Sequence, residues 1–269
     1  MTEADAIANS EVPLTRPVLV EQLRALGVAE GMTVMVHSSL SRLGFVIGGA
    51  QAVVEALLET VGSDGTLMMP THSGALSDPA NWQNPPVPES WWQTIRDEMP
   101  AFDPATTPTR MMGAIVECFR TVPGVKRSNH PTVSAAAVGP NAEALVAHHQ
   151  LADRFGETSP QGRLYELDGH ILLLGVDHGN NTSLHLAEAR SGLPGYVEDG
   201  APVIVDGHRQ WVTVSHLDDD ESDFAELGEA FAATGRERQA AIGSGVGRLF
   251  RSRDVIDFAV DWMKTNRTV

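Results

Sequence analysis

The 269-residue chain lacks the features that would mark a secreted, membrane or nucleic-acid-binding protein. Its single cysteine, Cys118, excludes an internal disulfide framework and a cysteine-based zinc site, and it fits a reducing compartment. No apolar run approaches the ~18 residues of a membrane span, and the first residues, 1–5, are acidic rather than typical of a signal peptide. Lys and Arg number 19 against 35 Asp and Glu, a net charge of −16, which argues against nucleic acid and anionic membranes as partners. We therefore expect a cytoplasmic protein.

Several familiar catalytic motifs are also missing. Neither the G-x-G-x-x-G nor the G-x-x-x-x-G-K-[ST] phosphate loop occurs, and the glycine-rich segment 243–247 fits neither pattern. There is no G-x-S-x-G nucleophile elbow. Asp177, His178, His185 and Glu188 offer ligand atoms, but the H-E-x-x-H spacing is absent, so we expect no metal.

What is present is an ordinary globular composition, with 42% apolar and 20% charged residues. Short β-branched or apolar runs alternate with helical patterns, which favours a three-layer α/β/α domain with a central, mostly parallel or mixed sheet. We expect one domain over 15–269, preceded by a flexible arm over 1–14. Strands are expected over 33–37, 66–70, 133–138 and 170–176, helices over 17–26, 53–61, 112–121, 140–148, 182–190 and 254–263, and a hairpin over 202–214.

The segment 77–108 interrupts this alternation. Its seven prolines exclude a long regular element, so we expect an ordered excursion with one short helix near 89–99. Long loops in compact domains are often binding loops, and this one is expected to form part of a substrate cleft. The alternative, that Trp82, Trp91 and Trp92 merely pin the loop to the body, carries equal weight.

A histidine and a glutamate stand three residues apart after the clearest buried strand. His185 and Glu188 would share one face of the helix expected over 182–190. The carboxylate can accept the proton of one imidazole nitrogen and raise the basicity of the other. Alone, this spacing is more typical of a surface ion pair. Its place at the carboxyl end of a strand, where open α/β sheets carry their sites, makes a catalytic dyad about equally favoured.

Two further segments suit phosphate groups. His37–Ser41 ends a strand in small hydroxyl residues, a type of turn whose backbone N–H groups bind phosphate. Lys126–Ser128 is a rare basic spot in an acidic chain. Each feature is commonplace alone, but together they predict an anionic, phosphate-bearing cofactor beside a histidine base.

Seven segments occur in an order that resembles a known family. They are Val36–Leu40, Gly65–Pro70, Phe102–Pro104, Val125–Pro131, Gly156–Pro160, Leu172–Val176 and Asn181–Glu188. In this order, over about residues 17 to 265, the chain is similar to the aminoglycoside 3-N-acetyltransferases, which are distinct from the GCN5-related acetyltransferases.

The resemblance implies an acetyl-CoA-dependent enzyme that acetylates the 3-amino group of a deoxystreptamine aminoglycoside and so confers antibiotic resistance. It implies His185 as general base, Glu188 as its orienting partner and Thr71 as a stabiliser of the oxyanion. The implied cofactor-binding residues are His37, Ser38, Ser39, Leu40, Ser41, Val125, Lys126, Arg127 and Ser128. The acidic acceptor site would be drawn from the segment 72–103 and the patch Asp218–Glu221. The implied substrate-binding residues are His72, Asp78, Asp103, Asn181, Asp218 and Asp220.

Two alternative functions stay open at this point. An acetyltransferase of the same mechanism could act on another cationic amine, and a homologue could bind CoA without catalysis, although an intact His185–Glu188 pair argues against the latter. The sequence also leaves the oligomeric state open, a homodimer included.

Overall fold

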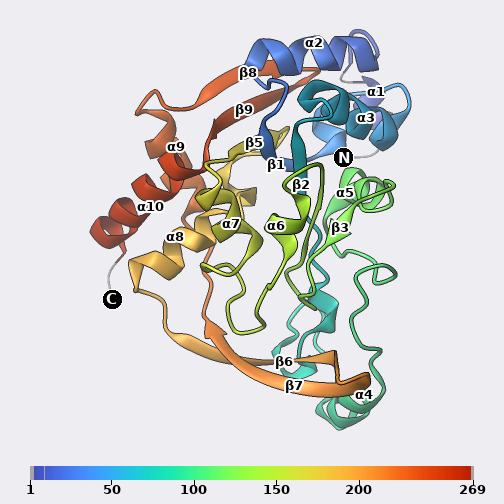
Figure 1. The fold of residues 1–269 in the computed structure, drawn as a ribbon, viewed down its shortest axis with the longest axis vertical. Coiled ribbons are helices and arrows are strands. Elements are labelled where there is room, and N and C mark those ends of the chain that lie inside the picture. The colour runs from blue at the N-terminus through green and yellow to red at the C-terminus, as the bar shows by residue number, and fades with distance from the viewer. Residues whose placement is uncertain (1–2, 9, 268–269) are drawn as a thin grey trace.

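The computed structural model describes residues 3–8 and 10–267 (Figure 1). Its central sheet has seven strands in the order β3-β4-β2-β1-β5-β9-β8. Three neighbouring strands run parallel: β1 (Thr33–Ser38), β2 (Thr66–Pro70) and β5 (His170–Leu174). The flanking strands are antiparallel to their neighbours: β3 (Lys126–Arg127), β4 (Ala135–Val138), β8 (Arg238–Ile242) and β9 (Gly245–Arg251). The sheet is therefore mixed.

Helices cover both faces of this sheet because the side chains of the central strands alternate between two apolar cores. Val34 and Val36 join one core, whereas Met35 between them joins the other. The first core contains residues of α2 (Arg16–Leu26), α3 (Gly49–Val61) and α5 (Gly113–Phe119). The second contains residues of α6 (Ala142–Val146), α7 (Pro160–Glu166), α8 (Leu184–Ser191), α9 (Phe224–Ala232) and α10 (Ser252–Asn266). The expected three-layer α/β/α fold with a mixed sheet is confirmed.

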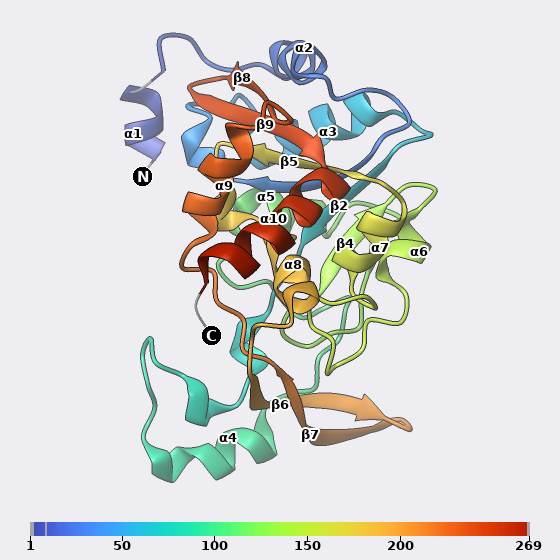
Figure 2. The ribbon, with the colours of Figure 1, turned by 90° about the vertical axis from the view of Figure 1, so that its left-hand side faces the viewer.

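A separate two-stranded sheet lies beyond the main body. It consists of β6 (Tyr196–Val205) and β7 (His208–Leu217), and Figure 2 shows it next to α4 (Trp92–Glu98) and away from the central sheet. The proline-rich excursion packs on this hairpin. Phe102 N donates to Pro202 O at 3.1 Å, and Arg209 Nε donates to Met99 O at 2.7 Å. The excursion and the hairpin thus form one layer that faces the carboxyl edge of the parallel strands.

Some elements differ from the expectation. The segment 1–14, expected to be a flexible arm, contains α1 (Glu3–Ala8), and Leu14 is buried and pairs with Val46. The β8–β9 hairpin and α7 were not expected, and Lys126–Arg127 was expected in a loop. β8 is an exposed edge strand and β3 has two residues, so neither shows a run of buried residues. α7 has seven residues and begins at the Ser159 cap, too short for a clear helical period.

No helix in the described part of the chain combines the length and the apolar character needed to cross a bilayer.

Candidate active site

Two cavities adjoin at the carboxyl edge of the parallel strands. The first, of about 920 Å³, lies over the turn after β1, and the second, of about 860 Å³, lies between the sheet and the β6–β7 hairpin. Both are lined by Ser38, Met111, Met112, Val176 and Asn180. Because parallel strands end at one edge, His37 and Ser38 of β1 meet the segment after β5 there.

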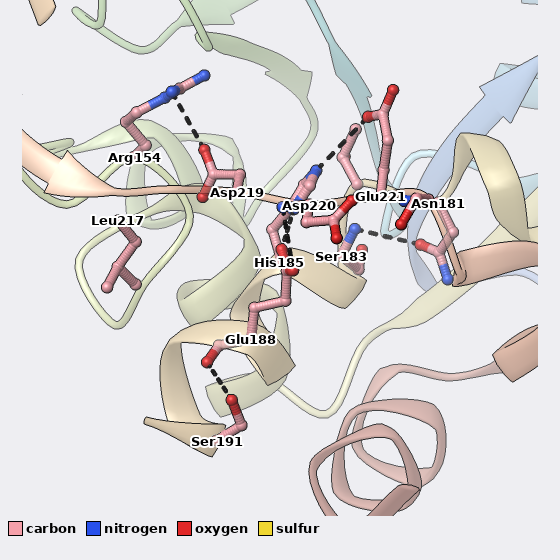
Figure 3. A network of polar contacts seen from close by, with 12 residues as sticks. Arg154, Asn181, Ser183, His185, Glu188, Ser191, Leu217, Asp219, Asp220 and Glu221 are labelled. Atoms are coloured by element: carbon pink, nitrogen blue, oxygen red, sulfur yellow. Dashed lines mark hydrogen bonds and ion pairs between the residues drawn. The ribbon is translucent and has the colours of Figure 1, made fainter. Parts of the chain in front are cut away.

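His185 and Glu188 form a buried pair in the second cavity. His185 stands in the first turn of α8, and Glu188 lies on the same face of this helix. The His185 Nδ1 atom is 2.5 Å from Glu188 Oε2, and the residues are 5% and 0% exposed, respectively. His185 Nε2 lies 4.0 Å from the exposed Glu221 on the opposite side (Figure 3). One imidazole nitrogen is therefore held by a carboxylate while the other is turned away from it.

The second oxygen of Glu188 is also engaged. Glu188 Oε1 accepts hydrogen bonds from Arg267 Nη1 at 2.5 Å and from the backbone N of Asp220 at 3.1 Å. A fully buried carboxylate needs such partners to remain ionised. These contacts orient the carboxylate toward His185, and so determine which imidazole nitrogen carries the proton.

Two phenylalanines hold the imidazole ring in place. The ring of Phe155 stacks on His185 at 4.5 Å between centroids, and Phe224 packs against it at 4.9 Å. Beside Phe155, Arg154 Nη1 forms an ion pair with Asp219 Oδ2 at 3.1 Å. Packing on both sides locks the side chain of the dyad histidine in one orientation.

His185, Glu188 and Asp219 each offer a ligand atom within 4.8 Å of the others, a grouping that could hold a metal ion. In this arrangement, however, both carboxylate oxygens of Glu188 already have partners, and Asp219 is paired with Arg154. The three side chains are thus engaged in ion pairs and hydrogen bonds around an imidazole.

Acidic side chains dominate the wall of the second cavity. Six carboxylates line it: Glu198, Asp199, Asp218, Asp219, Asp220 and Glu221. Among the lining residues of the described chain, Arg154 is the one arginine or lysine. Such a surface attracts cations, and several carboxylates in a concave wall favour a ligand with several positive charges.

Unpaired polar atoms collect where β1 and β2 end. Ser38 Oγ, His37 Nε2 and His72 Nε2 are buried, and none has a hydrogen-bond partner within residues 3–8 and 10–267. Burial lowers the pKa of His37 and that of His72 to about 3, so both imidazoles are neutral at pH 7. Buried polar atoms without partners in a binding cavity are free for a ligand.

The first cavity has the opposite electrostatic character. It is lined by the turn Ser39–Arg42 and by Arg248, with Asp177 as its acidic residue. Gly245 is required in its wall, because a Cβ atom there would lie 2.7 Å from Arg42 O. Hydroxyl side chains beside two guanidinium groups suit a phosphate-bearing molecule.

Comparison with known proteins agrees with this geometry. Residues 35–264 match the family model described as aminoglycoside 3-N-acetyltransferase. The chain belongs to the aminoglycoside 3-N-acetyltransferase family. The family predicted from the sequence is therefore confirmed, and with it an acetyltransferase.

Individual relatives of this acetyltransferase span nearly the whole chain. The SPbeta prophage-derived aminoglycoside N(3')-acetyltransferase-like protein YokD of Bacillus subtilis is 45% identical over 97% of this chain and 96% of its own. The crystal structure of YokD covers 99% of this chain and all of its own, with a TM-score of 0.97. Aminoglycoside N(3)-acetyltransferase VII of Streptomyces paromomycinus is 37% identical over 98% of this chain and 96% of its own.

Two similar solved structures contain ligands. AAC-IIIb was solved as a binary complex with CoASH; it is 30% identical, covers 96% of this chain and 100% of its own, and has a TM-score of 0.85. AAC-VIa was solved with sisomicin bound; it is 33% identical, with the same coverage and the same TM-score.

The structure gathers only part of the residue set expected for this acetyltransferase. His37, Ser38, His72, Asn181, His185, Asp218 and Asp220 line the second cavity, and Ser38, Ser39, Leu40 and Ser41 line the first. Glu188 lies directly behind His185. These residues lie together near the dyad, and their expected roles toward the acceptor and the cofactor stay predictions.

The segment Val125–Ser128 lines neither cavity, and its expected role in holding the cofactor stays a prediction. Arg127 donates to Thr71 O at 2.6 Å and to Thr107 O at 2.5 Å, while Lys126 pairs with Glu143 on the surface. Ser128 Oγ bonds to the ring of His149, and Val125 packs on the first core. The basic pair serves internal hydrogen bonds and a surface ion pair.

Three further expected residues line neither cavity. Thr71 is fully buried, and its hydroxyl is hydrogen-bonded to Ser134 and Arg127. Asp78 pairs with Arg96 at 2.7 Å, and Asp103 accepts from Ala105 N within its own turn. Of the excursion over 77–108, Asn81 lines the second cavity.

Several residues of the site were not among those expected from the sequence: Arg42, Arg154, Phe155, Glu198, Asp199, Phe224, Arg248 and Arg267. Asp219 lines the second cavity as a member of the expected acidic patch Asp218–Glu221. Arg154 and Phe155 reach His185 from a loop, and Arg267 reaches Glu188 across 79 residues. Such tertiary contacts have no periodic signal in the sequence.

Proposed function

We propose that this chain transfers the acetyl group of acetyl-CoA to the 3-amino group of a 2-deoxystreptamine aminoglycoside, and thereby confers resistance to such antibiotics. The observation that carries the proposal is the His185–Glu188 dyad, which lies in an acidic cavity that adjoins a second cavity with basic residues. The CoASH complex of AAC-IIIb and the sisomicin complex of AAC-VIa support the same pair of ligands.

The dyad supplies the base that the reaction needs. An ammonium group cannot attack a thioester, so a proton must leave the amine as the new bond forms. His185 Nε2 takes this proton, while Glu188 accepts the Nδ1–H and stabilises the imidazolium. The amine nitrogen bonds to the carbonyl carbon, the carbon–sulfur bond breaks, and the thiolate leaves to become the CoA thiol after it receives a proton.

The cofactor lies in the first cavity in this proposal. Arg42, Arg248 and the hydroxyl residues of the Ser39–Arg42 turn line the cavity that holds its phosphates, and the acetyl group reaches the junction of the two cavities at Ser38. Ser38 Oγ has no partner among the described residues, so it is free to donate to the oxyanion of the tetrahedral intermediate. Ser38 thus takes the role that the resemblance gave to Thr71.

The acceptor lies against the acidic wall. An aminoglycoside carries several ammonium groups, which pair with Glu198, Asp199 and Asp218–Glu221 and place one amine beside His185. The wall attracts the protonated groups, and the neutral His37 and His72 add no opposing charge.

The test is release of the CoA thiol from acetyl-CoA with gentamicin-, neomycin- and apramycin-like acceptors, followed by NMR of the products. We expect turnover with deoxystreptamine compounds and an acetamide at position 3, and a raised inhibitory concentration in cells that express the chain. Binding of acetyl-CoA without transfer to any compound of the panel would move the acceptor to another amine. Failure to bind acetyl-CoA would overturn the proposal altogether.

A further inference from the structure

Glu188 is held from outside its own helix by a residue that follows α10. Arg267 lies beyond residue 264, where the match to the family model ends. α10 packs against α8, and this brings the end of the described chain to the dyad (Figure 2). Arg267 is 16% exposed at its side chain, so most of the guanidinium group is buried.

The guanidinium group of Arg267 contacts two different parts of the site. Nη1 donates to Glu188 Oε1 at 2.5 Å, and the group also donates to the Asp223 carboxylate at 2.7 Å and 2.5 Å. Nη2 donates to Asp220 O at 2.8 Å as well. The dyad on α8 and the acidic segment after β7 are therefore fastened to one side chain.

We propose that Arg267 is a positioning residue of the His185–Glu188 dyad, which holds the Glu188 carboxylate toward the imidazole and offsets its negative charge. The inference rests on the proposed function, because it assigns to Arg267 the maintenance of the base. Arginine suits this place, since its planar fork can serve Glu188, Asp223 and a backbone carbonyl at once.

The charge of Arg267 matters because His185 is surrounded mostly by carboxylates. The charged or titratable groups that face it are Glu188 of α8, Asp219, Asp220 and Glu221 after β7, His72 after β2, and Arg154 behind Phe155. Without Arg267, this excess of negative charge would favour protonation of the dyad. A protonated imidazole cannot accept a proton from the amine, so Arg267 keeps the base in its working form.

The test compares Arg267→Met and Arg267→Lys with the unmodified chain, with Lys264→Met as the matched control. Lys264 is an exposed cation in the last turn of α10. For Arg267→Met we expect kcat to fall about tenfold or more, while the KM for acetyl-CoA stays within about twofold. In Arg267→Met the acid limb of the kcat/KM profile should also move to higher pH. Arg267→Lys keeps the positive charge and should show a smaller shift. Lys264→Met should leave kcat and the acid limb unchanged.

A second measurement keeps this inference separate from the proposed function. NMR of the labelled histidines, with the His185 signal assigned from a His185→Gln variant, should show that His185 titrates at higher pH in Arg267→Met than in the unmodified chain. Arg267→Met could instead lower only the melting temperature and leave the His185 midpoint and the acid limb of kcat/KM unchanged. Arg267 would then have a structural role only, and the inference would be overturned. If the unmodified chain acetylates none of the acceptors, the proposed function fails, and the NMR titration still decides the role of Arg267.

Discussion

At the scale of single residues, we assign the base and the oxyanion donor to two different side chains. His185 is held by Glu188 and packed by Phe155, whereas Ser38 offers a free buried hydroxyl where the two cavities meet. Thr71, the residue expected to stabilise the oxyanion, is turned toward Ser134 instead. Substitutions of Ser38 and Thr71 are therefore expected to differ in their effect on kcat.

Ser38→Ala should lower kcat by about 10²-fold, because loss of one oxyanion donor removes stabilisation that exists mainly in the transition state. The KM for acetyl-CoA should change little. Steady-state kinetics of thiol release measure both constants.

Thr71→Val is the matched control for this prediction. It should lower the melting temperature, because Arg127 and Ser134 lose a partner, and leave kcat near the unmodified value. A large loss of kcat in Thr71→Val together with normal kcat in Ser38→Ala would contradict the assignment.

At the scale of elements, Arg127 ties the excursion to the end of β2. Its guanidinium group donates to Thr71 O and Thr107 O and lies over the ring of Phe102 at 4.9 Å. Arg127→Met would remove the donor of the half-buried Thr107 O and one of the two donors of Thr71 O, which keeps its bond from Ser134 Oγ; the expected cost is about 1–3 kcal/mol. We expect a melting temperature lower by several degrees in a thermal scan, with an unchanged KM for acetyl-CoA.

Lys126→Met supplies the comparison, because the Lys126–Glu143 pair is exposed and such pairs contribute little to stability. It should melt within about 1–2 °C of the unmodified chain. An increase in the KM for acetyl-CoA in Arg127→Met with no loss of stability would instead show that Arg127 contacts the cofactor.

Local patterns predicted the elements that carry the dyad, and tertiary contacts account for what could not be predicted. His185 and Glu188 are three residues apart on one helix, and the acidic run 218–221 is contiguous, so both are visible in the sequence. The basic pair Lys126–Arg127 suggested phosphate, but buried carbonyls compete for the same guanidinium group. Arg267 reaches Glu188 only because α10 packs on α8.

At the scale of the whole molecule, several buried histidines link stability to pH. Burial lowers the pKa of His37 and of His72 to about 3 and that of His149 to about 4, and it lowers the pKa of His130 well below its ordinary value. In the unfolded chain these groups titrate near ~6.5. Above that pH these histidines are neutral in the folded and in the unfolded chain. Below it, they take up protons in the unfolded chain while they stay neutral in the folded one.

The free energy of unfolding should therefore fall as pH drops from about 6.5 toward 4, and be nearly constant from about 7 to 8. Urea unfolding at pH 8, 7, 6 and 5 measures this directly. His149→Gln should show a shallower fall over the same range, because one of the titrating groups is gone. An equal fall in the variant would show that His149 does not contribute.

The central claim is that His185 acts in the chemical step and not in binding of the cofactor. Calorimetric titration with acetyl-CoA and turnover with an accepted aminoglycoside, both on His185→Ala, test it together. Our account predicts that the affinity for acetyl-CoA stays within a factor of about three while kcat falls by about 10²–10⁴-fold. Turnover that survives in His185→Ala with unchanged affinity would contradict it, because the proton of the amine would then leave by another route.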